Sequence, residues 1–125
     1  MLKPLPTLPN PWITHKSEQI YDSPWISLTK HEVTNPNGNP GTYSVVHFQN
    51  LAIGVIAMDE ALNTWLVGQW RYPLEKYSWE IPEGGGSKFV DPLDSAKREL
   101  EEETGITANK WTQILEMHLS NSATD

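Results

Sequence analysis

The chain has 125 residues, a formal net charge of −7 and no cysteine. This length fits one domain with a modest core. An acidic chain without a basic cluster argues against electrostatic binding of nucleic acid. The lack of cysteine excludes a disulfide framework and a thiolate zinc site. Because no apolar run reaches about 18 residues, a typical transmembrane helix is also excluded. We therefore predict a cytoplasmic protein that binds neither nucleic acid nor membrane.

The N-terminal segment is rich in proline and contains the run KPLPTLPNPW. Proline disfavours a regular strand because it has no backbone N–H. We therefore predict an extended arm over residues 1–16, followed by a single domain over residues 17–125. Trp12 packs either on the chain's own core or on a partner subunit.

Alternating apolar and polar residues around Ile26 and Leu28 are typical of a half-buried strand. Glycine, asparagine and proline in residues 35–41 predict a turn, so that the following strand completes a hairpin. A nearly continuous apolar run further on predicts a central strand. The expected strands are residues 18–34, 42–48, 51–58, 64–70, 79–81 and 111–119.

One helix is predicted after a run of three glycines. Asp91 is a good N-cap, Pro92 suits the first helical position, and Gly105 supplies the left-handed residue that ends the helix. Asp94 adds negative charge to the first turn, where the helix dipole favours it. At about 100° per residue, the apolar face of the helix consists of Leu93, Ala96 and Leu100.

The second half of this helix is crowded with glutamate. Glu99, Glu102 and Glu103 share one side, whereas Glu101 points away. Like charges at this spacing cost about 0.2–0.5 kcal/mol per pair, and the dipole disfavours anions near the helix end. Mg²⁺ or Mn²⁺ would offset the repulsion, because these hard cations prefer carboxylate oxygens. The alternative interpretation is a solvated charged face.

The run RELEEETGI at residues 98–106, with Gly84 at the correct spacing before it, matches the Nudix box G-x5-E-x7-R-E-U-x-E-E-x-G-U. The chain therefore resembles the Nudix hydrolases. This resemblance implies an α+β fold, an α/β/α sandwich with a mixed sheet. It also implies that three glutamates are catalytic ligands of Mg²⁺ or Mn²⁺, namely Glu99, Glu102 and Glu103, and that Arg98 is structural.

The chain departs from the box at two positions. Val90 stands where the box has glutamate, and Phe89 stands where glycine is usual. In the family, that glutamate supports the arginine of the box. The resemblance therefore implies that Arg98 lacks this partner and that activity is impaired.

Two further segments resemble the ADP-ribose and ADP-sugar pyrophosphatase branch of the family. GQWRYP contains Arg71 and resembles the branch's QYR-x-P, and WEIPEG contains Glu80 and resembles E-(L/I)-P-A-G. The resemblance implies that Arg71 meets the substrate's phosphates and that Glu80 lies near the nucleotide or the metal. Gly84 and Gly85 would let the backbone approach the substrate closely.

The reaction implied is metal-dependent hydrolysis of the diphosphate in ADP-ribose or another ADP-sugar, which releases AMP and a sugar phosphate. Several alternatives stay open at this point. Arg71 could make an ordinary surface ion pair. The aromatic residues Trp70, Tyr72 and Trp79 could stack on adenine or belong to a core or an interface. The whole chain could be a non-catalytic module that binds a nucleotide or oligomerises.

The last residues, SNSATD, resemble a segment from the middle of the branch's sequences. We therefore expect an incomplete sheet with one face uncovered. An uncovered apolar face favours pairing with a second copy, so we predict a homodimer. Its plausible anchors are Trp12, Trp25 and Trp111.

Overall fold

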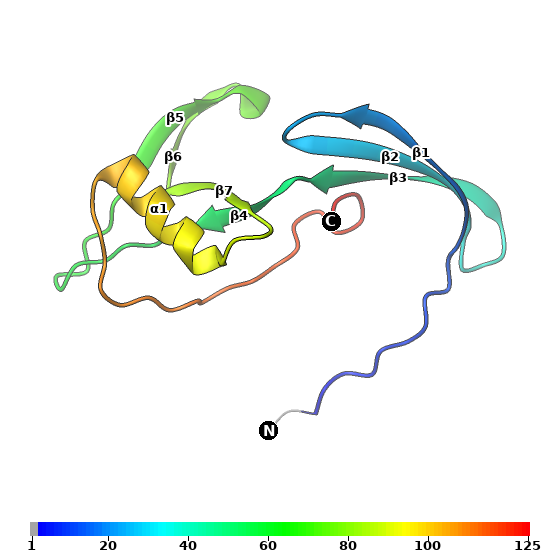
Figure 1. Cartoon of the computed structure of the whole chain (residues 1–125), viewed down its shortest axis with the longest axis horizontal. Coiled ribbons are helices and arrows are strands. Elements are labelled where there is room, and N and C mark those ends of the chain that lie inside the picture. Colours follow the sequence, from blue (N-terminus) through cyan, green and yellow to red (C-terminus); the bar gives the residue numbers. More distant parts are fainter. Residues whose placement is uncertain (1–2) are drawn as a thin grey trace. The chain divides into compact units, whose positions relative to one another are not determined.

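The computed structural model describes residues 3–125, which form two compact units. One unit contains the residues up to Phe48 together with His118–Asp125, and the other contains Gln49–Met117. Figure 1 shows the strands β1 to β7 and the single helix α1 along the chain. The α+β class predicted from the sequence is confirmed. All strand ladders are antiparallel, so the expected mixed sheet is represented among residues 3–125 only by an isolated parallel bridge.

The first unit is a three-stranded sheet in the order β1-β2-β3, formed by β1 (Ile13–Asp22), β2 (Ile26–Thr34) and β3 (Pro40–Phe48). The single strand expected over residues 18–34 is wrong, because the chain turns between β1 and β2. Ser23 makes this turn: its backbone N–H donates to Ile26 O at 2.9 Å, and its hydroxyl accepts from Ile26 N at 3.1 Å. Pro24 follows and cannot donate to a ladder.

The expected hairpin between β2 and β3 is confirmed. Its turn is closed by Asn35, whose side-chain oxygen accepts from the backbone N–H groups of Asn37 and Asn39, both at 3.0 Å. Gly38 has a φ of 81°, which favours glycine over residues with a Cβ. The turn residues therefore act as the composition indicated.

Both ends of the chain differ from the expectation. β1 begins at Ile13, inside the segment predicted as an arm, and Trp12 packs edge-on against Tyr43 with ring centroids 5.3 Å apart. The strand expected over residues 111–119 is absent: within the described chain, no ladder follows the helix. The terminal residues instead lie along β3, where Val46 bridges Thr124.

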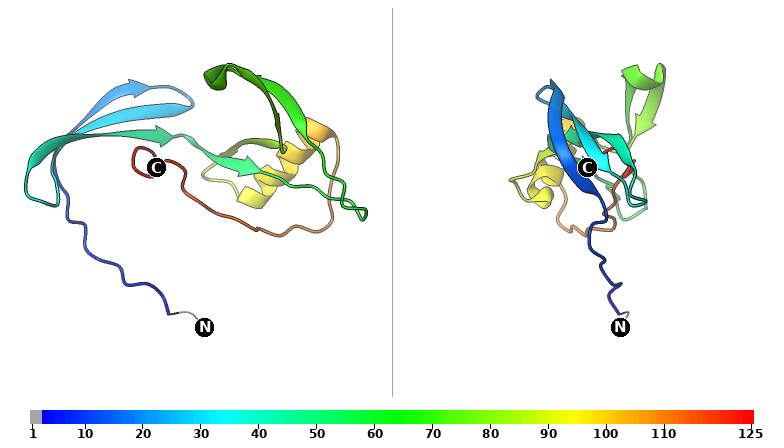
Figure 2. Two further views of the ribbon diagram at one scale, coloured as in Figure 1. Left: turned by 180° about the vertical axis from the view of Figure 1, so that it is seen from behind. Right: turned by 90° about the vertical axis from the view of Figure 1, so that its right-hand side faces the viewer.

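The second unit contains two antiparallel strand pairs and the helix. β4 (Asn50–Gly54) pairs with β7 (Glu83–Ser87), and β5 (Val67–Arg71) pairs with β6 (Lys76–Glu80). A short 3₁₀ turn, η1 (Tyr72–Leu74), joins β5 to β6. Both views of Figure 2 show α1 against β4 and β7, while the β5–β6 hairpin extends away from the helix.

The apolar run at residues 51–58 does not form the expected central strand. β4 ends at Gly54 and pairs only with β7, and the next residue, Val55, donates its backbone N–H to Pro82 O at 2.9 Å. The side chains of Val55 and Ala57 enter the core with Leu100 instead. Trp65, Ala96, Ile106 and Trp111 pack around these three. Burial in this core accounts for Val55 and Ala57, whereas Leu51, Ile56 and Met58 of the same run are exposed.

The helix α1 (Pro92–Thr104) has the predicted boundaries. The Asp91 side chain caps it by accepting from Leu93 N at 2.8 Å, and Gly105 ends it with a φ of 73°. Leu100 is fully buried, as expected, but Leu93 is 41% exposed and stays largely outside the core. Among residues 3–125, the structure contains no helix long and apolar enough to cross a membrane.

Candidate functional site

The glycine run is part of a strand, and it allows the helix to pack closely against the sheet. A Cβ at Gly84 would overlap the carboxylate of Glu99, so glycine leaves the space that this carboxylate fills. A Cβ at Gly86 would lie 2.8 Å from the Ser95 hydroxyl, whereas one at Gly85 would make only ordinary contact with Asn50 at 3.5 Å. The structure thus gives Gly84 and Gly86 a packing role between β7 and α1.

One arginine lies between two glutamates on the helix, and we call Arg98, Glu99 and Glu102 the helix cluster. Arg98 Nη2 lies 2.8 Å from Glu99 Oε1, and Nη1 lies 3.2 Å from Glu102 Oε2. Nη2 also donates to the carbonyl oxygen of Gly85 at 3.0 Å. Arg98 lacks the box glutamate at position 90, but the helix itself and β7 supply other acceptors for it.

The third expected metal ligand, Glu103, is held by the neighbouring strand. Its Oε2 accepts from the backbone N–H of Glu83 at 3.0 Å. Glu99 is buried, whereas Glu102 and Glu103 are exposed. The three carboxylates offer the hard oxygen donors that Mg²⁺ and Mn²⁺ prefer, so the donor chemistry fits such an ion. Within residues 3–125, however, no three acidic or histidine side chains converge on one point, because Arg98 and Glu83 engage these oxygens.

A second arginine lies between two glutamates on the hairpin, and we call Arg71, Glu80 and Glu83 the hairpin cluster. Arg71 Nε donates to both carboxylate oxygens of Glu80, at 2.7 and 3.0 Å. Arg71 Nη2 also donates to Glu80, and it reaches Glu83 Oε1 as well, both at 2.5 Å. The two acids come from β6 and β7, so this cluster joins the hairpin to the strand that packs on the helix.

The charges in the hairpin cluster perturb one another. Hydrogen bonding to Arg71 lowers the pKa of Glu80 to about 2, and the bond to Glu80 raises the pKa of Arg71. Glu83 responds in the opposite direction: burial and the adjacent Glu80 carboxylate raise its pKa. Glu80 is therefore the firmly ionised partner of Arg71, and Glu83 is a second, less favourable anion beside it.

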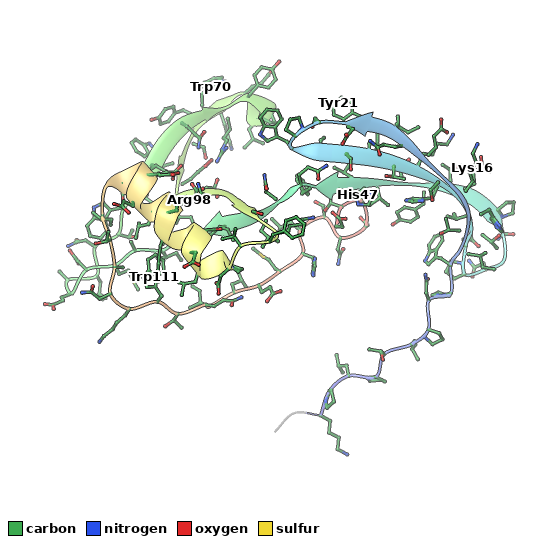
Figure 3. The ribbon with its side chains drawn as sticks, viewed as in Figure 1. Lys16, Tyr21, His47, Trp70, Arg98 and Trp111 are labelled. Carbon is green, nitrogen blue, oxygen red and sulfur yellow. The ribbon has the colours of Figure 1, made fainter. Side chains whose placement is uncertain are left out.

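Strand register separates these polar residues from the aromatic ones. Arg71 and Glu80 lie on one face of the β5–β6 hairpin, because side chains alternate along each strand. Trp70, Tyr77 and Trp79 lie on the other face, where Tyr77 and Trp79 make an edge contact at 5.5 Å. Figure 3 labels Trp70 on this hairpin and Arg98 on α1. An adenine stacked on Trp70 or Trp79 would therefore lie on the opposite face from Arg71.

Glu83 is the site residue that the sequence interpretation missed. It connects both parts of the site, since its carboxylate meets Arg71 and its backbone N–H meets Glu103. The available signal was the run WEIPEG, in which Glu83 occupies the position of alanine in the branch pattern E-(L/I)-P-A-G. Arg71, Glu80, Gly84, Gly85, Arg98, Glu99, Glu102 and Glu103 all belong to the second unit, as one site requires.

Family models match almost the whole chain. Residues 48–125 match the Nudix domain, and residues 12–46 match the N-terminal domain of nucleoside diphosphate sugar hydrolases. The chain therefore belongs to the Nudix family, as the box predicted.

Curated relatives make the comparison more specific. The chain is 38% identical over 112 residues to the ADP-ribose pyrophosphatase of Bacillus subtilis (strain 168), covering 90% of this chain and 60% of that protein. It is 31% identical to the ADP-ribose pyrophosphatase of Mycobacterium tuberculosis, covering 90% of this chain and 54% of the relative. It is also 36% identical to the methanol dehydrogenase activator of Bacillus methanolicus, covering 90% of this chain and 60% of that protein. The chain thus spans a little over half the length of these relatives.

A solved structure supports the same fold. The crystal structure of an ADP compounds hydrolase matches with a TM-score of 0.82 over 95% of this chain and 64% of the other. Its sequence identity of 18% makes this a likeness of fold.

Proposed function

We propose that this chain hydrolyses the diphosphate of ADP-ribose or another ADP-sugar and releases AMP and a sugar phosphate, with Mg²⁺ or Mn²⁺ as cofactor. The observation that carries the proposal is the contact of Glu83 with both Arg71 and Glu103. This contact brings a phosphate-binding arginine beside carboxylates suited to a hard cation. The names of the pyrophosphatase relatives support the same substrate class.

Each charged residue has a distinct role in this proposal. Glu99, Glu102 and Glu103 would hold the ion, and Arg98 positions the first two by its bonds at 2.8 and 3.2 Å. When bound, the ion would neutralise the diphosphate and lower the pKa of an attacking water. Arg71 would bind phosphate oxygens, because a guanidinium forms paired, charge-assisted hydrogen bonds with them.

Glu80 and the glycines support these groups. Glu80 fixes the orientation of the Arg71 guanidinium by accepting from both Nε and Nη2. Gly84 gives the buried carboxylate of Glu99 its place against β7. Gly85 offers its carbonyl oxygen to Arg98 and has no side chain to obstruct a ligand. The reaction breaks one phosphorus–oxygen bond of the diphosphate, and the water oxygen is added to that phosphorus.

A non-catalytic nucleotide-binding or oligomerisation module is the second candidate. Two observations favour it: Arg98 already forms ion pairs with both carboxylates of the helix cluster, and no acidic triad converges among the described residues. In this case the chain would bind a nucleotide sugar through Arg71 without cleaving it.

AMP release from a panel of nucleotide sugars distinguishes the two candidates. With millimolar Mg²⁺, we expect AMP from ADP-ribose or another ADP-sugar, and none after chelation. Glu103→Gln should abolish most of the activity, whereas Glu101→Gln removes the same charge from the side of the helix that points away and should keep it. Binding without AMP release, in all metal conditions, would favour the non-catalytic module.

We also propose that the chain forms a homodimer. All of β1 is exposed, and so are the aromatic side chains Trp25 (72%), Trp70 (61%) and Trp79 (67%). Exposed aromatic surface favours association, because large aromatic side chains dominate interface energetics. Of the anchors expected from the sequence, Trp25 fits this role best, since Trp12 and Trp111 pack within the chain. Sedimentation over a concentration series tests this, and a monomer at all concentrations would refute it.

A further inference from the structure

The hairpin cluster contains one more carboxylate than its arginine needs. Glu80 already holds Arg71 in a two-pronged interaction through Nε and Nη2, and its side chain is only 17% exposed. This pair is electrically neutral by itself and fixes the plane of the guanidinium. Glu83 adds a second negative charge at Nη2, so the cluster as a whole carries a net charge of −1.

Glu83 is anchored at its backbone and accessible at its carboxylate. The Glu83 backbone N–H donates to Glu103 at 3.0 Å, which fixes the strand beside the helix. Its side chain is 40% exposed, more than twice the exposure of Glu80. A carboxylate with this exposure can turn into solvent while β7 stays in place.

A phosphate oxygen and a carboxylate oxygen are equivalent acceptors for a guanidinium. We propose that Glu83 is an internal competitor of the substrate: its carboxylate occupies Arg71 Nη2 in the ligand-free protein and is displaced by a diphosphate oxygen on binding. Glu80 keeps its own contacts and holds the guanidinium ready. This inference rests on the proposed function and assigns to Glu83 control over affinity.

The competitor also disfavours weakly charged ligands. A ligand with one negative charge gains little by replacing Glu83, because it exchanges one anion for another. A diphosphate spreads its negative charge over two phosphoryl groups, so one group can displace Glu83 while the other remains free for further contacts. The exchange therefore favours diphosphates over ligands with a single negative charge.

The test is the affinity of the full chain for a methylene-bridged, non-hydrolysable ADP-ribose analogue in Mg²⁺, measured by calorimetry. We expect Glu83→Gln to bind it about tenfold more tightly, since one charge-assisted hydrogen bond no longer has to be broken. In hydrolysis, KM should fall in Glu83→Gln.

Two controls make the result specific. Glu75→Gln removes the same charge from an exposed position on the same hairpin and should leave the affinity unchanged. In an Arg71→Ala background, Glu83→Gln should give no gain, because the contested donor is gone. If Arg71→Ala does not fold, Arg71→Met serves, since methionine keeps much of the side-chain length and has no hydrogen-bond donor.

Other outcomes overturn the inference. Equal affinity of wild type and Glu83→Gln would show that Glu83 does not compete, while the proposed function would stand. Weaker binding by Glu83→Gln would make Glu83 part of the ligand-binding or metal-binding set instead. A gain in affinity that persists without Arg71 would show that Glu83→Gln acts by removing a negative charge from the site, and not by freeing Arg71. If no variant binds the analogue, both the proposed function and this inference fail.

Discussion

The helix cluster and the hairpin cluster have the same composition, one arginine between two glutamates, but they are built differently. In the helix cluster, Arg98 and its two glutamates all belong to α1: Glu102 is four residues after Arg98, a spacing that the helix brings together, and Glu99 is its neighbour in the chain. In the hairpin cluster, the three residues come from β5, β6 and β7. The first arrangement follows from the period of a helix, whereas the second exists only after three strands have found their register.

Exposure divides each cluster in the same way. One glutamate is well covered, Glu99 at 10% and Glu80 at 17%, and the other is exposed, Glu102 at 58% and Glu83 at 40%. The covered glutamate orients the arginine, and the exposed one is available for exchange with a ligand or an ion. If substrate and metal bind as proposed, we expect the exposed member of each cluster to move more than the covered one.

The largest expected effect comes from breaking the packing beneath the helix cluster. Gly84→Ala would place a Cβ on the buried Glu99 carboxylate and should destabilise the protein by about 1–3 kcal/mol, as overpacking does. Gly85→Ala is the matched control, because its Cβ would meet Asn50 at an ordinary 3.5 Å. Urea unfolding of both variants measures the difference. Equal stability of the two would mean that Glu99 does not pack against Gly84.

A smaller effect separates the two clusters by pH. The folded-state pKa of Glu80 is lowered from 4.5 to about 2, so its contribution to stability is present above pH 4.5 and is lost as the pH falls towards 2. Glu80→Gln should therefore be less stable than wild type at neutral pH, and the difference should shrink below pH 4.5. Denaturant unfolding at a series of pH values checks this. A difference in stability between the two proteins that is the same at about pH 6 and about pH 3 would contradict the Glu80–Arg71 pair.

The smallest effect is expected at Val90. Arg98 already has acceptors on Glu99, Glu102 and Gly85, so a glutamate at this exposed position has no vacant arginine to serve. Val90→Glu should change stability by no more than about 0.5 kcal/mol, the usual range for surface positions, and should leave the hydrolysis rate nearly unchanged. Rate measurements on the folded variant decide. A clear rise in rate would restore the interpretation that the departure from the box impairs activity.

The sequence predicted the helix better than the sheet. Asp91, Pro92 and Gly105 act locally, and each has the capping role that its residue type indicates. The signal for the hairpin of β2 and β3 was also local in the sequence, since Asn35 and Gly38 form its turn. The structure of the apolar run after Asn50 is not local, because β4 ends at Gly54 and only Val55 and Ala57 of the run are buried, against the helix.

The candidate site shows the same limit. The glutamates of the helix were predicted from their period and from the family box. Arg71 and Glu80 were suggested by resemblance alone, and their contact depends on the register of β5 and β6. Glu83 was missed because its partners are 12 and 20 residues away in the sequence, on elements that only the fold brings together. The packing role of Gly84 likewise required the position of Glu99.

The most direct test of the central claim is whether the helix glutamates bind a divalent cation. Thermal unfolding with and without millimolar Mn²⁺ measures this, because a ligand of the native state adds about 2.7 kcal/mol of stability at roughly a hundredfold excess over Kd. We predict a raised midpoint for wild type and for Glu101→Gln, and a much smaller rise for Glu103→Gln. An unchanged midpoint in wild type, or an equal rise in Glu103→Gln, would contradict a metal site on this helix.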